Sequence, residues 1–129
     1  DAVRDYIYVG DVIEGLICMN NSPKKFEGDA YNLCSGKGYS VEQIIEIYSQ
    51  ISKKVIEPIF KNPTTYWNQF PSLFDGLPLS RKRISKEVFK NSIGSPSKTK
   101  KTFNFESRVD FVDGLKRVYD YSLKNLKSN

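Results

Sequence analysis

Near its N-terminus the chain contains the stretch Arg4-Asp5-Tyr6-Ile7-Tyr8-Val9-Gly10-Asp11. Residues 6–9 are aromatic or β-branched, which favours a short strand, and Gly10 ends it. Asp11 and Glu14 have the spacing of a helix capping box, and apolar residues follow them at helical intervals. We therefore predict a strand at residues 6–9, a tight turn, and a helix from Asp11 to about Met19.

The same order of signals recurs further along the chain. Ala30-Tyr31-Asn32-Leu33-Cys34 predicts a second strand, and a capping box at Ser40 and Gln43 opens an amphipathic helix that runs to about residue 53. A third strand is predicted at residues 55–60, at a sheet edge because its proline has no N–H to donate. Further helices are predicted at about residues 82–90, 96–102 and from 111 onward. The predicted fold class is α/β, mixed α+β within this chain, with short strands and four to five helices.

The composition excludes several classes of protein. The 129 residues have the size of one domain, and no apolar run approaches the ~18 residues of a membrane span. The first residues lack the basic start and apolar core of a signal peptide, and two cysteines suit a reducing compartment, so we expect a cytoplasmic protein without a membrane partner. Histidine is absent, which removes Ser-His-Asp and Cys-His mechanisms and two-histidine metal sites.

The net charge of +5 points to an anionic partner, and much of the excess lies at residues 81–86 and 98–101. A phosphorylated small molecule fits this moderate excess better than nucleic acid, for which the sequence has no motif. Two alternatives stay open: a solvated basic helix surface, and a basic domain that associates with nucleic acid.

The chain also carries a series of short motifs in a set order. They are residues 4–9, 11–12, 30–33, 35–36 and 39–41, followed by 94–98, 103–105, 109–111 and 113–115. In order and spacing this series resembles the C-terminal part of the extended short-chain dehydrogenase/reductases, the nucleotide-sugar epimerase and dehydratase group. Residues 94–98 and 103–105 are similar to that family's Ser-Lys-Ala helix and Leu-Gly-Trp turn, and the resemblance covers essentially the whole chain.

The resemblance implies that residues 1–129 are the C-terminal, substrate-binding part of a longer Rossmann-type enzyme whose N-terminal dinucleotide-binding half is absent from this chain. The family's G-x-x-G-x-x-G loop and Tyr-x-x-x-Lys pair do not occur here, and Ser35-Gly36-Lys37-Gly38 has the wrong spacing for the loop. The parent would be an NAD(P)-dependent nucleotide-sugar epimerase, dehydratase or reductase that binds NAD or NADP. We expect this chain alone to be inactive and to bind no cofactor.

The resemblance also implies a set of substrate-binding residues. Arg4 would contact the diphosphate of the nucleotide-sugar and Tyr6 would flank the nucleotide, since guanidinium geometry suits bidentate phosphate recognition. Arg83 would supply a second cation, with Arg81 and Lys86 as local alternatives because the family's downstream acid is displaced here. The competing interpretations are a surface arginine at position 4 paired with Asp5 or Asp11, a half-buried strand tyrosine at position 6, and a basic helix face that is only solvated.

The aromatic stretch with Tyr66 and Trp67 supplies a stacking wall for a base or sugar, or else plugs the core or a domain seam. Asp11 and Ser40 are interpreted as helix caps, and Cys18 and Cys34 as packing residues without chemistry.

The expected partners are a nucleotide-sugar, the missing Rossmann half, and a second copy of the chain. Self-association is expected because the strand at residues 30–34 would lack its neighbours and the apolar faces of Ile44, Ile45 and Tyr48 would be uncovered. The alternative function is a stand-alone, non-catalytic nucleotide- or anion-binding module.

Overall fold

The structure is a computed structural model that describes residues 2–24, 28–62, 67–73 and 80–126. Its strands are β1 (Val3–Asp5) and β2 (Gly38–Ser40). Its helices are α1 (Val9–Asn20), α2 (Val41–Ser52), the 3-10 helix η1 (Pro71–Leu73), α4 (Arg81–Phe89), α5 (Ser97–Phe103) and α6 (Phe111–Leu126). Within the described ranges this is a mixed α/β fold with five α-helices and a two-stranded sheet. The fold class and the number of helices are those that the sequence predicted.

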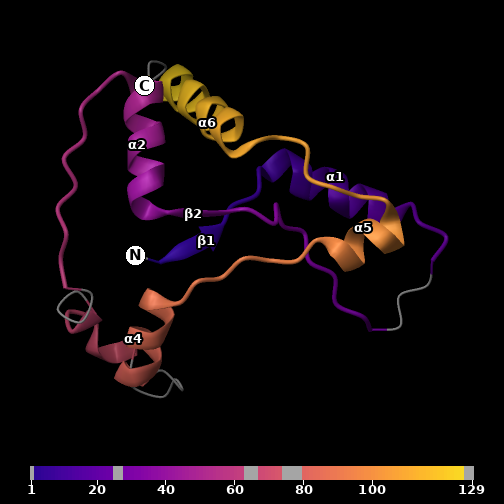
Figure 1. The fold of residues 1–129 in the computed structure, drawn as a ribbon, viewed down its shortest axis with the longest axis horizontal. Helices are drawn as coiled ribbons and strands as arrows, with labels where there is room; N and C mark the ends of the chain where they lie inside the picture. Colours follow the sequence, from indigo (N-terminus) through magenta and orange to yellow (C-terminus); the bar gives the residue numbers. More distant parts are fainter. Residues whose placement is uncertain (1, 25–27, 63–66, 74–79, 127–129) are drawn as a thin grey trace.

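The strand β1 lies between two segments that are far from it in sequence (Figure 1). On one side it pairs antiparallel with β2, so that Arg4 is opposite Tyr39. On the other side the N–H of Ser92 donates to the Val3 carbonyl at 2.9 Å, and the N–H of Asp5 donates to the Ser92 carbonyl at 3.0 Å. The chain that leaves α4 is thereby fastened along β1.

Two pairs of helices pack around this centre. α2 contacts α6 through Tyr48 and Tyr119, whose rings are 5.6 Å apart and nearly perpendicular. α1 lies beside α5 (Figure 1), where the Cys18 thiol donates to the Phe103 carbonyl at 3.3 Å. A Cβ added to Gly15 would lie 2.6 Å from the side chain of Leu33, so glycine is what allows α1 to approach this closely.

The apolar core is small. Among the described residues the buried apolar side chains are those of Phe103 and Phe105, and the most deeply buried residue is Thr99. None of the helices in the described parts of the chain combines the length and apolar character needed to cross a bilayer.

The capping signal at Ser40 is confirmed. The Gln43 N–H donates to Ser40 Oγ at 3.2 Å, and the Ser40 N–H donates to Gln43 Oε1 at 2.9 Å, so both halves of the capping box are present. α2 ends where Lys53 adopts a left-handed conformation, as expected at a helix C-terminus. The three later helices also form within one or two residues of their predicted bounds.

The predictions for the first strand and its helix were partly wrong. The strand lies at Val3–Asp5 rather than at residues 6–9, because the pairing partners β2 and Ser92 face those earlier residues. α1 begins at Val9, with Tyr8 at the cap position and no side-chain cap. Asp11 is therefore not a helix cap: its Oδ2 accepts the N–H groups of Arg108 and Val109, each at 2.9 Å.

The strands predicted at residues 30–34 and 55–60 are absent from the structure. Carbonyl groups of the first segment instead accept side-chain hydrogen bonds from α5, from Thr99 Oγ1 to Asn32 at 2.7 Å and from Lys98 Nζ to Ala30 at 3.1 Å. The second segment runs extended and apart from the sheet (Figure 1), with Val55 91% exposed. β-propensity alone does not make a strand where no neighbouring strand is available.

Candidate functional site

Arg4 lies in the middle of β1 and its side chain reaches α4. The half-buried guanidinium group donates to the Val3 carbonyl at 3.1 Å and to the Glu87 carbonyl in the last turn of α4. The two carboxylates considered as its partners, Asp5 and Asp11, accept main-chain N–H groups of other segments instead. The interpretation of Arg4 as half of a surface ion pair is therefore wrong.

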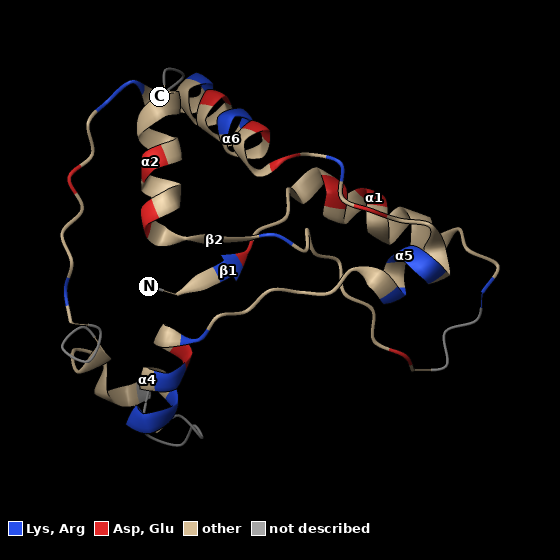
Figure 2. Cartoon of the chain, viewed as in Figure 1, with Lys and Arg blue, Asp and Glu red and all other residues tan. Residues whose placement is uncertain are grey.

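α4 places further cations next to this contact. Residues 81–90 contain five basic residues and one acidic residue, and Figure 2 shows α4 as a concentration of positive charge. The helix begins where Ser80 Oγ accepts the Arg83 N–H at 3.2 Å, and Arg81, Arg83 and Lys86 are exposed on it. Glu87 is one helical turn after Arg83, so the Arg4 guanidinium contacts α4 about 6 Å along the helix axis from the backbone of Arg83.

Asp5 binds two separate loops with one carboxylate. Its Oδ1 accepts the Ser35 N–H at 2.9 Å and the Ser35 hydroxyl at 2.6 Å. Its Oδ2 accepts the N–H groups of Gly36 at 2.9 Å and Gly94 at 3.1 Å. Burial favours the protonated form of this carboxyl group, but the four hydrogen bonds outweigh it and the pKa of Asp5 is lowered.

Cys34 is beside this cluster. Burial and then the nearby Asp5 carboxylate raise the pKa of its thiol, which disfavours the reactive thiolate form. A Cβ added to Gly94 would lie 2.6 Å from its sulfur, so the side chain is packed tightly against that backbone. Both cysteines are free, in agreement with their interpretation as packing residues.

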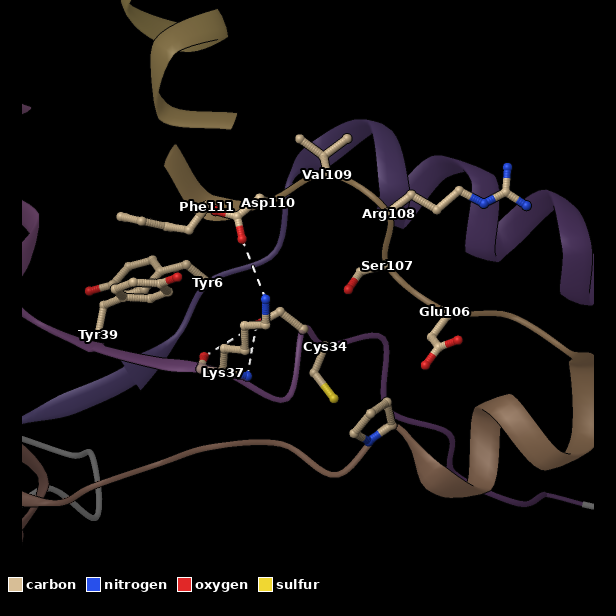
Figure 3. Close-up of a pocket in the computed structure, with 12 residues that line it drawn as sticks. Tyr6, Cys34, Lys37, Tyr39, Glu106, Ser107, Arg108, Val109, Asp110 and Phe111 are labelled. Carbon is tan, nitrogen blue, oxygen red and sulfur yellow. Dashed lines mark hydrogen bonds and ion pairs between the residues drawn. The ribbon is translucent and has the colours of Figure 1, made fainter. Parts of the chain in front are cut away.

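Tyr6 lies at a cavity of about 210 Å³ between β2 and the start of α6 (Figure 3). Its ring is 5.5 Å from that of Phe111, which in turn stacks on Tyr39 at 4.2 Å. On the polar side of the cavity Lys37 Nζ is 3.4 Å from Asp110 Oδ1. Tyr6 is 38% exposed, which leaves part of its ring accessible to a ligand.

The remaining predicted residues are at the aromatic stretch. Trp67 is half-buried in a turn before η1, where its carbonyl accepts the Phe70 N–H at 3.1 Å. Tyr66 lies outside the described residues. The role of this stretch in binding a base or sugar stays a prediction.

The sequence analysis missed the roles of Asp5 and Asp11. Each carboxylate accepts main-chain N–H groups from residues at least 30 positions away. The sequence does contain an aspartate beside a predicted strand and, elsewhere, a Ser-Gly turn. That these two segments contact each other follows only from the tertiary fold. Within the described residues no group of three His, Cys, Asp or Glu side chains is arranged to hold a metal ion.

Solved structures with this fold are Rossmann-type epimerases. The UDP-glucose 4-epimerase of Thermotoga maritima, determined with UDP-glucose, superposes with a TM-score of 0.70 and 26% identity over 97% of this chain and 33% of its own. An enzyme of Bordetella bronchiseptica determined with NAD+ and UDP superposes with a TM-score of 0.67 and 26% identity over 98% of this chain and 30% of its own.

Sequence comparison gives the same group. A UDP-glucose 4-epimerase of Bacillus subtilis is 38% identical over 55 residues, which is 42% of this chain and 16% of the relative. A UDP-glucuronate 4-epimerase of Thermodesulfobacterium geofontis is 29% identical over 125 residues, which is 96% of this chain and 31% of the relative. No family model matches the chain. The chain is thus similar in sequence and in fold to nucleotide-sugar epimerases of the extended short-chain dehydrogenase/reductases, and it spans a third or less of the length of these relatives.

Proposed function

We propose that this chain is the substrate-binding part of an NAD(P)-dependent nucleotide-sugar epimerase, dehydratase or reductase, and that it holds the nucleotide diphosphate through Arg4. The observation that carries the proposal is the contact of the Arg4 guanidinium with the last turn of α4. It joins Arg4, the residue predicted to bind phosphate, to a helix with four basic residues and one acidic residue. A diphosphate carries charge that two or more cations together neutralise.

The ligands of the related structures support the choice of a nucleotide-sugar. The Thermotoga maritima enzyme was determined with UDP-glucose and the Bordetella bronchiseptica enzyme with UDP. Arg83 and Lys86 on α4 are the proposed second cations, and Tyr6 is the proposed flank of the nucleotide. The accessible part of its ring and the adjoining cavity suit that role.

The residues of this chain do not fit a dinucleotide. A pyrophosphate loop offers free main-chain N–H groups, whereas those of the glycine-containing turn at residues 35–38 are engaged. Ser35 and Gly36 donate to the Asp5 carboxylate, and Lys37 donates to Ser35 Oγ at 3.1 Å. NAD is present in related structures, so we assign the cofactor and the proton transfer to a part of the enzyme beyond these residues.

In this proposal the chain contributes binding energy rather than chemistry. The diphosphate is remote from the sugar carbon that reacts, and holding it fixes the sugar against the cofactor. Binding energy realised at such a remote group lowers the barrier by orienting the reacting atoms. Arg4 and its neighbours orient the substrate, and no proton or hydride passes through them.

The test is a thermal-shift screen of the complete gene product with UDP-, dTDP- and GDP-sugars in the presence of NAD(H). A ligand that binds only the folded protein raises its Tm, by an amount that grows with ligand concentration over Kd. We expect one nucleotide class to give a concentration-dependent rise. The absence of any rise, with NAD(H) still stabilising the protein, would contradict the proposed function.

A further inference from the structure

We propose that Asp5 is a positioning residue that holds Arg4 and α4 at the separation needed to bind a nucleotide diphosphate. This inference rests on the proposed function. The structure brings Arg4 to α4 by one side-chain hydrogen bond, which is too little to fix a whole helix. The segment that returns from α4 to β1 also has to be fixed in place, and Asp5 binds the end of that segment that lies farther from α4.

The return segment is fastened to β1 at three successive points. Asn91 Oδ1 accepts the Val3 N–H at 3.0 Å, and Ser92 exchanges two main-chain hydrogen bonds with β1. The Gly94 N–H then donates to Asp5 Oδ2 at 3.1 Å. The path from α4 to β1 therefore ends on the Asp5 carboxylate.

Asp5 and Arg4 act from opposite faces of the same strand. Side chains of successive strand residues point to opposite faces, so Arg4 reaches α4 on one side while Asp5 binds the turn at Ser35 and Gly36 on the other. Asp5 thereby fixes β1 through the face opposite the Arg4 side chain. Loss of the anchor would let β1 shift relative to α4 and would separate the cations that the diphosphate needs.

Asp11 provides a matched comparison. It is also an aspartate with main-chain ligands, it is 3% exposed, and its Oδ2 accepts two N–H groups at 2.9 Å. Those groups belong to Arg108 and Val109, which connect α5 to α6, and α4 is not part of that connection. A purely structural role would therefore make the two aspartates equivalent, whereas a positioning role would single out Asp5.

The experiment is a double-mutant cycle in the complete gene product. The probe is whichever of UDP, dTDP, GDP and CDP stabilises the wild-type protein most, and its Kd is measured by calorimetry below the Tm of every variant. Asp5→Asn keeps the volume of the side chain but replaces an acceptor oxygen with a donor, so either the Ser35 N–H or the N–H groups of both Gly36 and Gly94 lose their acceptor. We expect this change to raise Kd about tenfold in the presence of Arg4, and less than about twofold in the Arg4→Ala background. Asp11→Asn should lower Tm yet leave Kd within about twofold of wild type.

The outcomes separate this inference from the proposed function. If Arg4→Ala leaves the Kd of the nucleotide unchanged, the proposed diphosphate site itself is wrong. If Arg4→Ala weakens binding but Asp5→Asn adds the same factor in both backgrounds, or matches Asp11→Asn, then Asp5 only stabilises the fold. Ser35→Ala removes the 2.6 Å hydroxyl contact with Asp5, together with the contacts of that hydroxyl with the main chain of Lys37, and serves as a milder variant should Asp5→Asn not fold. Its smaller loss of affinity should also vanish without Arg4, and persistence of that loss would overturn the inference.

Discussion

The guanidinium of Arg4 donates a hydrogen bond to the carbonyl of Glu87, 83 positions later in the chain. This contact connects β1 to the last turn of α4 and places a half-buried arginine beside a basic helix. A single neutral carbonyl is a weaker partner than a phosphate, because a phosphate carries negative charge and accepts two parallel hydrogen bonds from one guanidinium. Arg4 is therefore held in place at low cost and remains able to bind an anion.

The lowered pKa of Asp5 predicts how stability depends on pH. A carboxyl group with a lower pKa in the folded state stabilises the protein above its unfolded pKa of about 3.9, and this contribution is lost as the pH falls through the folded pKa. We expect the Tm difference between the wild-type protein and Asp5→Asn to be constant from pH 7 to about 5 and to shrink below about 4. Thermal melts of both proteins across this range check it, and a difference that grows on acidification would contradict it.

The isolated chain should lack enzymatic activity. Residues 1–129 have no G-x-x-G-x-x-G loop and no Tyr-x-x-x-Lys pair, and the amides of the turn at residues 35–37 are engaged by Asp5 and Ser35. We expect no change in NADH absorbance on mixing the chain with NAD+ and UDP-glucose, and no heat of NAD binding by calorimetry. The complete gene product is the positive control. Hydride transfer by residues 1–129 alone would overturn the assignment of the chemistry to another part of the enzyme.

The isolated chain should also self-associate, although through a different surface from the one that the sequence suggested. Ile44 and Ile45 are half-buried, and Tyr48 packs on Tyr119 while 37% exposed, so this face of α2 is partly covered. α1 instead exposes an apolar stripe at helical spacing, with Val9, Ile13, Leu16 and Ile17 each 53–62% exposed. Stripes of this kind seldom stay uncovered on a monomer.

Sedimentation velocity over a wide concentration range checks the association of residues 1–129. We expect Leu16→Lys, in the middle of the stripe, to shift the distribution toward monomer, and Gln50→Lys on the exposed side of α2 to leave it unchanged. A wild-type chain that stays monomeric at high concentration, or two variants that behave alike, would show that α1 does not mediate association.

The sequence predicted those elements whose signals are local. The capping box of Ser40 and Gln43 specifies the start of α2 by itself, since both of its hydrogen bonds lie within four residues. The strands depended on partners that no local pattern reveals. Val3–Asp5 is a strand because Gly38–Ser40 and Ser92 pair with it, whereas residues 55–60 have the right composition and no partner.

The candidate site was predictable to the same extent. Arg4 and the basic segment with Arg83 were found from motif order and charge, and the structure joins their elements through Glu87. Asp11 was misassigned because an aspartate near a helix start has two uses, as a cap for its own helix and as an acceptor for a distant loop. The choice depended on Arg108 and Val109, almost a hundred positions away.

The most direct test of the diphosphate site is the affinity of the complete gene product for its nucleotide-sugar after Arg4→Ala. The account predicts binding weaker by about 1.5–3 kcal/mol, the scale of a hydrogen bond to a charged group, with the affinity for NAD nearly unchanged. Arg117→Ala, at an exposed arginine of α6 whose guanidinium lies 5.3 Å from the centroid of the Tyr8 ring, is the matched control and should alter neither affinity. Nucleotide-sugar affinity that survives Arg4→Ala while NAD affinity falls would contradict the account.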